Sequence, residues 1–311
     1  MRSKPSRKRI GIVGLGSIAE KAYLPLLASH PGVEIIGLVS KRKETVKRFG
    51  QLYRINQCHT HLEDLLYKEP DAVFIHTPTE THFDVVSKCL AAGIHVYVDK
   101  PLSYEIKQSV AMAEQAERKG KLLCVGFNRR FAPLYVRAKQ WMEEAGGIDQ
   151  CIAQKHRVSK QSLTAKQTLY DDLIHMIDLL LWLGCGSHAL TGYFQKDDEQ
   201  GRLVHASGSL SWGSQSGFFA MNRGSSSDLE KLELYGGGRS AVVTNLDQGV
   251  FGSVETGERQ DTFDSWSSIS YRRGFVGIVE HFLESLDHQE HCQIRADQVL
   301  PVHFLIEKLA P

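Results

Sequence analysis

The sequence lacks an excess of charge of either sign, and it lacks long apolar runs. Its 37 Lys and Arg residues against 36 Asp and Glu residues leave a formal net charge of +1 at pH 7. Without a net field to attract nucleic acid or a membrane surface, we expect neither as a partner. No stretch approaches the ~20 apolar residues of a membrane-spanning helix. The basic start MRSKPSRKR has no apolar run before Ile10, so we expect a disordered tail rather than a signal peptide, and a cytoplasmic protein.

The cysteines lack the close spacing of metal or redox motifs. None forms a C-x-x-C pair, and several lie in apolar runs. Scattered thiols of this kind are typical of buried free cysteines in a reducing compartment, and we predict no metal site. The six residues are Cys58, Cys89, Cys124, Cys151, Cys185 and Cys292.

The most informative segment that is present reads IGIVGLGSIA, from Ile10 to Ala19. An apolar strand leads into a G-x-G-x-x-A turn and then into a helix-forming stretch. Gly14 permits the tight turn, Gly16 lets the backbone approach a pyrophosphate, and Ala19 lets the helix pack against the strand. The N–H groups that open the helix attract phosphate. We favour a dinucleotide site over a merely structural turn, because the strand and the helix flank the turn correctly.

The pattern of elements predicts an α/β chain of two domains. Over residues 1–125, apolar strands alternate with amphipathic helices, which is typical of a doubly wound parallel sheet of the Rossmann kind. Over residues 126–311, short alternating segments separated by turn signals predict an α+β domain with an open, mostly antiparallel sheet. The last two predicted helices are Phe275–Ser285 and Ala296–Leu309.

The end of the second predicted strand indicates which dinucleotide binds. NAD-binding folds place a carboxylate there for the ribose 2′-hydroxyl, but this chain has Ser40, Lys41 and Arg42. A hydroxyl and two cations suit a 2′-phosphate, so NADP is favoured over NAD. In the alternative interpretation, the two cations are a solvated helix start and Ser40 is its cap.

Two further strand ends carry polar residues, and in such sheets the carboxyl ends of strands line the ligand crevice. Thr77 and Pro78 follow the third strand, where the nicotinamide ribose would pass. Asp99 and Lys100 follow the fourth. Because Lys100 comes directly after an apolar strand, a role in the cleft is favoured over an ordinary surface charge.

A carboxylate and an imidazole lie four residues apart at Asp171 and His175. On a helix they share a face and form a general acid/base pair that can move a substrate hydroxyl proton. Three alternatives remain open: an acidic helix cap, a satisfied structural histidine, and a metal site, for which two side chains are thin support.

Together these motifs resemble the Gfo/Idh/MocA family of nicotinamide-dependent sugar and polyol oxidoreductases, in particular its MviM/YceM branch. The resemblance spans essentially the whole chain. Its motifs are GLGSIA at 14–19, TPTETH at 77–82, DKP at 99–101, GFNRRF at 126–131 and DDLIHMID at 171–178.

The resemblance implies a role for each matching residue. Lys100 corresponds to the lysine that contacts substrate and nicotinamide, His175 to the proton acceptor, and Asp171 to the residue that orients it. Asp99 replaces the usual glutamate, Leu173 a usual glycine, and Tyr170 a usual small residue. The cofactor-binding residues that we predict are Gly14, Gly16, Ser17, Ile18, Ser40, Lys41, Arg42, Thr77, Pro78, His82, Asp99, Lys100 and Asn128.

We therefore predict an NAD(P)-dependent oxidoreductase that acts on a secondary alcohol or ketone of a sugar, polyol or derivative. The alternative is a dinucleotide-binding sensor or interaction protein of the same fold without turnover, which the side chains of Leu173 and Tyr170 motivate. The open sheet of the second domain needs a cover for one face, so a homodimer or homotetramer is expected.

Overall fold

The structure, a computed structural model, describes residues 7–184 and 186–310, so most of the predicted tail and Cys185 lie outside the described residues. The chain forms two compact units. The first contains residues 7–126 and Val279–Leu300, and the second contains Phe127–Ile278 and 301–310. The division into 1–125 and 126–311 therefore differs from the structure over Val279–Leu300. That segment belongs with the first unit because the Phe282 ring packs edge-on against Phe74, at 5.1 Å between centroids.

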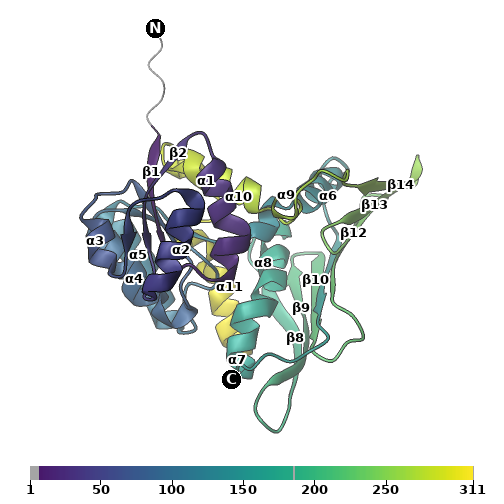
Figure 1. The fold of residues 1–311 in the computed structure, drawn as a ribbon. Coiled ribbons are helices and arrows are strands. Elements are labelled where there is room, and N and C mark those ends of the chain that lie inside the picture. Colours follow the sequence, from purple (N-terminus) through teal and green to yellow (C-terminus); the bar gives the residue numbers. More distant parts are fainter. Residues whose placement is uncertain (1–6, 185, 311) are drawn as a thin grey trace. The chain divides into compact units, whose positions relative to one another are not determined.

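The first unit contains a six-stranded sheet in the order β3-β2-β1-β4-β5-β6, in which every pairing is parallel. This confirms the predicted doubly wound sheet. Figure 1 labels two of its strands, β1 and β2, and helices of the same unit around them. The two-residue strand β3 and the five-residue helix α3 were not predicted, because each is too short to show a periodic apolar pattern. The elements are β1 Lys8–Val13, the π-helical turn η1 Ala19–Tyr23, α1 Leu24–Ser29, β2 Val33–Val39, α2 Lys43–Tyr53, β3 Cys58–His59, α3 Leu62–Leu66, β4 Ala72–Ile75, α4 His82–Ala91, β5 His95–Val98, α5 Ile106–Lys119 and β6 Leu123–Val125.

The strands of this sheet are buried on both faces. All four residues of β4 are fully buried, as are Val96, Tyr97 and Val98 in β5, which explains why these strands are continuous apolar runs. Because the strands are parallel, the carboxyl ends of β1, β2, β4 and β5 lie along the same edge. The residues that follow those ends are the predicted cofactor residues.

The second unit contains an eight-stranded sheet in the order β14-β13-β12-β11-β7-β10-β9-β8. Only β7 and β10 pair in parallel, which confirms a mostly antiparallel sheet. The strands are β7 Gln150–His156, β8 Ala189–Asp197, β9 Leu203–Trp212, β10 Gln215–Asn222, β11 Leu229–Gly236, β12 Arg239–Thr244, β13 Gln248–Ser253 and β14 Gly257–Thr262.

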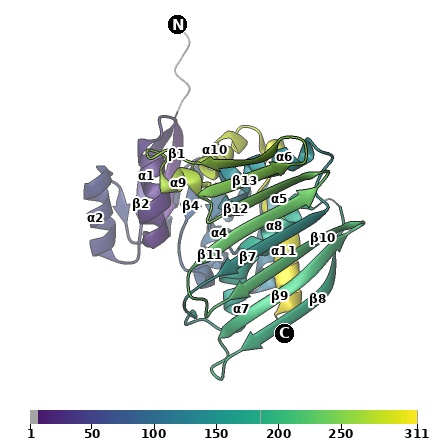
Figure 2. The same cartoon turned by 90° about the vertical axis from the view of Figure 1, so that its right-hand side faces the viewer.

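Helices cover one face of this sheet. The other face of the same strands is turned toward the viewer in Figure 2, with the helices behind it. Side chains alternate accordingly: in β7, Cys151, Ala153 and Lys155 are buried toward the helices, whereas their neighbours are half-buried. The helical segments of this part of the chain are α6 Pro133–Glu143, α7 Ala165–Thr168, the π-helical turn η4 Leu169–Leu173, α8 Ile174–Leu183, α9 Ile269–Arg272, α10 Phe275–Ser285 and α11 Ala296–Leu309, of which α10 and α11 contribute residues to both units.

Two further findings concern the chain as a whole. None of the helices within the described ranges is long and apolar enough to cross a bilayer. The five cysteines in those ranges are free thiols, as expected, and only Cys58 is partly exposed. The structure also brings the Cys124 and Cys292 sulfur atoms to 3.2 Å, although they are 168 residues apart.

Candidate active site

The glycine turn after β1 has the two properties that were predicted for it. Gly14 has a φ of +90°, and a Cβ there would lie 2.5 Å from the backbone carbon of His76. Only glycine allows the two strand ends to approach this closely. Gly16 is exposed, and a Cβ there would meet nothing within 4 Å. The space over Gly16 is thus open to a ligand, whereas Gly14 serves the fold.

The helix that follows begins in an unusual way. Ser17 and Ile18 are exposed beside the turn, while Ala19 is fully buried against the sheet. The Glu20 N–H donates to the Gly16 carbonyl at 3.0 Å, and residues Ala19–Tyr23 form a π-helical turn before α1 begins. Such turns occur often at functional sites. The exposed Gly16, Ser17 and Ile18 form the open part of the turn.

The residues after β2 leave two cations available. Lys41 and Arg42 are exposed, and the structure records no ion pair or side-chain hydrogen bond for either within its described ranges. The Ser40 hydroxyl accepts a long hydrogen bond, 3.4 Å, from the Arg42 N–H. Arg42, rather than Ser40, is the N-cap residue of α2, and its side chain makes no cap. The interpretation of Ser40 as a helix cap is therefore wrong.

His82 joins the turns that follow β4 and β5. Its ring is 1% exposed, and its nitrogen atoms lie 2.9 Å from the Pro101 carbonyl and 3.0 Å from the Thr77 carbonyl. Burial lowers the pKa of His82, against the opposing influence of these two carbonyl contacts. Thr77 is held from its other side by the Thr81 hydroxyl at 2.8 Å. His82 thus positions Thr77 and Pro78 through the backbone.

Asp99 lies in a buried network next to Lys100. A carboxylate oxygen of Asp99 is 2.8 Å from His76 Nδ1. The His76 ring stacks on Tyr23 with 4.1 Å between centroids, and the Tyr23 and Tyr97 hydroxyls are 2.8 Å apart. Burial, reinforced by the Asp99 charge, raises the pKa of both tyrosines. This network fixes Asp99, the aspartate that stands where the resemblance implies a glutamate.

Asp171 and His175 lie together at the start of α8 in the second unit. Asp171 belongs to the π-helical turn η4 and His175 to the first turn of α8, so they lie about one helical turn apart. Asp171 is half-buried and accepts a 2.6 Å hydrogen bond from the Gln161 side chain. His175 is 4% exposed. Both residues lie in the helical segment that the sequence predicts, and their action as a carboxylate–imidazole pair stays a prediction.

Asp172, next to Asp171, serves a different purpose. It forms ion pairs with Lys155 and, at 2.9 Å, with Arg223. Although burial alone would raise the pKa of Asp172, these cations hold it well below its ordinary value. Burial lowers the pKa of Lys155 to about 8, against the opposing influence of Asp172. Asp172 is thus ionised, and its role is to form ion pairs that stabilise the fold.

Asn128 and its neighbour Arg129 are buried within the second unit. The Asn128 amide donates to the Arg273 carbonyl at 2.8 Å and accepts from Arg129 at 3.1 Å. Arg129 binds Glu230 through two bonds of 3.0 Å. Asn128 is 2% exposed, so its contact with a cofactor remains a prediction that the structure does not test.

The sequence patterns missed several residues of these networks. His76, Gln161, Arg223 and Glu230 precede or follow the recognised motifs and carry no motif of their own. Lys155 offered a signal, because it occupies a position of β7 that alternates with buried Cys151 and Ala153. A lysine at a buried strand position implies a buried carboxylate partner.

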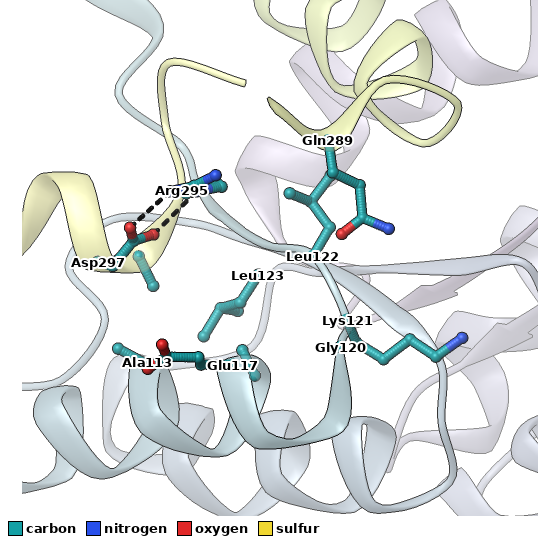
Figure 3. A pocket seen from close by; sticks show the side chains of 11 residues that line it. Ala113, Glu117, Gly120, Lys121, Leu122, Leu123, Gln289, Arg295 and Asp297 are labelled. Carbon is teal, nitrogen blue, oxygen red and sulfur yellow. Dashed lines mark hydrogen bonds and ion pairs between the residues drawn. The ribbon is translucent and has the colours of Figure 1, made fainter. Parts of the chain in front are cut away.

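One cavity lies elsewhere in the first unit, with a volume of about 320 Å³. Figure 3 shows the Arg295–Asp297 ion pair at one side of it and Glu117 and Lys121 at another. The cavity borders the start of β6, at the opposite sheet edge from Gly14. Its lining includes none of the predicted site residues, and we assign it no role.

A group of three candidate metal ligands consists of His288, Glu290 and His291. All three side chains are exposed, and none was predicted as a site residue. Structural metal sites are usually closed and supported by further hydrogen bonds, so we assign no metal here.

Comparison with family models gives a match over most of the chain. Residues 8–127 match an oxidoreductase family with an NAD-binding Rossmann fold, and residues 133–252 match a YceM-like C-terminal domain.

Individual relatives agree with this. The chain is 33% identical over 304 residues to the putative oxidoreductase YceM of Salmonella typhimurium, covering 97% of this chain and 96% of that protein. A crystal structure of the dehydrogenase MviM from Clostridium difficile superposes with a TM-score of 0.91 and 31% identity, covering 97% of this chain and 98% of that one. The scyllo-inositol 2-dehydrogenase (NADP(+)) IolW of Bacillus subtilis is 27% identical over 214 residues, covering 65% of this chain and 59% of that protein.

Proposed function

Since the chain belongs to the Gfo/Idh/MocA oxidoreductase family, we propose that it is an NADP(H)-dependent oxidoreductase that interconverts a secondary alcohol and a ketone in a sugar, polyol or related compound. The observation that carries the proposal is the Asp171–His175 pair at the start of α8. A carboxylate one turn from an imidazole is suited to proton transfer at a hydroxyl group.

Each polar residue has a defined role in the alcohol-to-ketone direction. His175 accepts the hydroxyl proton, and Asp171 orients the imidazole and binds a neighbouring hydroxyl of the substrate. Lys100 donates a hydrogen bond to the reacting oxygen and stabilises the negative charge that develops there. Nicotinamide supplies the hydride chemistry when bound. The same residues act in reverse for ketone reduction.

The residues of the first unit fit a dinucleotide. Gly16 leaves open space where a side chain would stand, and Ser17 and Ile18 are exposed beside it. Lys41 and Arg42 are exposed cations at the end of β2, where a carboxylate for NAD is absent. A planar guanidinium binds a phosphate group through two donors. These observations support NADP over NAD. The names of the relatives include both cofactors: IolW is named as an NADP(+) enzyme and another scyllo-inositol 2-dehydrogenase of Bacillus subtilis as an NAD(+) enzyme.

We also propose that the chain assembles as a homodimer or homotetramer through the open face of the eight-stranded sheet. That face carries half-buried side chains such as Ile152 and Tyr235, together with the exposed Phe218. Light scattering at micromolar concentration is the test, and a monomer would contradict the proposal.

The test of the reaction uses Lys100→Met and His175→Ala. Purified protein is first screened with NADPH or NADP against a panel of sugars, polyols and their keto forms, and the absorbance of reduced cofactor is followed. With a substrate identified, each variant is expected to lower kcat by about 10²–10⁴-fold. His291→Ala, an exposed histidine outside the site, is the matched control and should leave kcat unchanged.

Two outcomes would contradict the proposal in different ways. If turnover survives both substitutions, the roles assigned to Lys100 and His175 are wrong. If the protein binds NADPH tightly yet reduces or oxidises no member of the panel, the sensor alternative is favoured.

A further inference from the structure

Charged side chains gather at one end of the helix-covered face of the second unit's sheet. Lys155 lies near the end of β7, and Arg157, two residues on, directly follows the strand, so the two point to the same side where the chain stays extended. Arg223 comes one residue after β10, which runs parallel to β7 with Asn222 opposite His156. Glu230 pairs with Lys155 across the antiparallel β11. The register of three strands therefore brings these four residues together beside Asp172.

The cluster holds more cations than buried carboxylates. Arg129, Lys155 and Arg223 are buried cations and Arg157 is a half-buried one, whereas Asp172 and Glu230 are the buried anions. Arg129 donates hydrogen bonds to both carboxylate oxygens of Glu230, and Lys155 forms an ion pair with Asp172. Arg157 and Arg223 share carboxylates that already have a partner.

Two other carboxylates face the cluster, and neither neutralises it directly. Asp171 accepts a hydrogen bond from Gln161 and belongs to the proposed proton-transfer pair. Asp228 is exposed and accepts from the Val158 N–H at 3.0 Å. Both influence Arg223 only through the longer-range attraction of their charges.

The guanidinium groups of Arg157 and Arg223 have donors without acceptors. Arg157 lies 3.9 Å from Asp172 and 3.9 Å from Glu230, too far for hydrogen bonds, and its Nη1 donates only to the His156 carbonyl. Its side chain is 24% exposed. Arg223 is 5% exposed, and its Nε has no hydrogen-bond acceptor among the described residues.

A buried guanidinium with an unsatisfied donor, such as the Nε of Arg223, is unfavourable, and a nearby anion lowers that cost. We propose that the substrate carries an anionic group, a carboxylate or a phosphate, which binds Arg157 beside Asp171 with Arg223 and Lys155 adding positive charge behind it. This deepens the proposed function and rests on it, because the anion is part of the molecule whose hydroxyl His175 deprotonates. Arg157 is the specificity residue, since it combines partial exposure with unused donors.

The first experiment measures anion binding without turnover. The thermal midpoint is measured in sodium phosphate and in sodium D-gluconate, each against sodium chloride of the same ionic strength. The proteins are the unmodified chain, Arg157→Gln, Arg157→Lys and the control Arg118→Gln, an exposed arginine of α5 in the first unit. Phosphate or gluconate should raise the midpoint of the unmodified chain and of the control by about 3 °C. Arg157→Lys should keep part of the rise and Arg157→Gln none.

The response to the two salts distinguishes a phosphate from a carboxylate group. An equal rise in Arg157→Gln would show that the anion binds elsewhere, and no rise in the unmodified chain would show that no such site exists. Either result overturns the proposal.

The second experiment compares matched substrates. D-Gluconate is tested beside D-glucitol, and D-glucose 6-phosphate beside D-glucose, with reduced cofactor as the readout. The anionic member should have a kcat/KM at least about tenfold higher. Arg157→Gln should raise KM for the anionic member and leave the neutral one nearly unchanged.

The outcomes separate this inference from the proposed function. Turnover of the neutral members with equal or higher kcat/KM would preserve the oxidoreductase assignment and overturn the anion site. An anion-dependent rise in midpoint that is lost in Arg157→Gln, with no turnover of any panel member, would keep the anion site and count against the oxidoreductase assignment.

Discussion

The two units form their predicted sites from different kinds of groups. In the first unit the site is mainly backbone: a glycine turn open over Gly16 and two exposed cations, Lys41 and Arg42. In the second unit Asp171 and His175 lie beside buried ion pairs, with Asp172 held by Lys155 and Arg223. Each site adjoins a π-helical turn, at Ala19–Tyr23 and at Leu169–Leu173.

The proposed function accounts for this difference. Backbone N–H groups and open glycine space suit phosphates, which every dinucleotide shares. In the proposed substrate site, the charges on β7 and β11 and directly after β10 would suit one kind of substrate, because their positions depend on the register of three strands. We therefore expect a substitution in the first unit to change either stability or binding. In the second unit, we expect a substitution to change both together.

The largest effect is expected from Arg130→Met in the second unit. Arg130 binds Asp178 through bonds of 3.0 and 2.6 Å, and Asp178 is fully buried. Leaving a buried carboxylate without its cation costs about 3–5 kcal/mol of unfolding free energy. Denaturation in urea is the measurement. Arg130→Met combined with Asp178→Leu should recover most of the loss, and failure of the double variant to recover would contradict this account.

The next effect concerns the acid stability of the same unit. Burial alone would raise the pKa of Glu230, but Arg129 and Lys155 lower it from 4.5 to about 2. Above about pH 5 both native and unfolded chains carry this charge, so its stabilisation is fully present. As the pH falls, the unfolded chain takes up the proton first, and about 3 kcal/mol is lost by about pH 2.

Unfolding free energy measured from pH 6 to pH 2 tests this. In Glu230→Gln the decline between about pH 5 and pH 2 should be shallower, whereas Glu114→Gln, at an exposed site on α5, should retain the full decline. Identical profiles for all three proteins would refute the prediction.

Alanine substitutions at two glycines of the same turn in the first unit should have different effects. Gly14→Ala forces a Cβ to 2.5 Å from the His76 backbone at a φ of +90°, and we expect a loss of about 2–4 kcal/mol in stability. Gly16→Ala meets no atom within 4 Å, so stability should change by less than about 1 kcal/mol. NADPH titration should nevertheless show about tenfold weaker binding for Gly16→Ala. Unchanged affinity there would remove Gly16 from the cofactor site.

The smallest effect is on cofactor preference. Arg42→Ala should lower the ratio of NADPH to NADH affinity by about tenfold, because one charge-assisted contact to a 2′-phosphate is lost. Lys47→Ala, an exposed cation on the same helix, is the control. Parallel fluorescence titrations with both cofactors measure this affinity ratio. An unchanged ratio in Arg42→Ala would contradict the proposed preference for NADP.

Local signals predicted most elements of the chain. The predicted bounds of α10 and α11 agree with the structure to the residue, because both segments have strong apolar periodicity. Gly120 ends α5 with a φ of +60°. By contrast, β14 reads GERQDT, and its residues are almost all exposed. It lacks any apolar alternation, so only its pairing with β13 makes it a strand.

The candidate site was predicted in the same uneven way. The residues within a local motif were predicted, because such a motif consists of residues that lie close together in the sequence, on one turn or on one face of a helix. Their partners were not found, because Gln161, Arg223 and Glu230 meet Asp171, Asp172 and Arg129 only after distant segments fold together.

By itself the sequence determined the two kinds of sheet, the glycine turn and the Asp171–His175 spacing, since these depend on residues close together in the chain. Only the tertiary structure decided that Val279–Leu300 belongs with the first unit, that His76 binds Asp99, and that Arg157 and Arg223 lie near Asp172. The physical reason is that burial and strand register, which set the partners of a charge, arise only when segments far apart in sequence pack together.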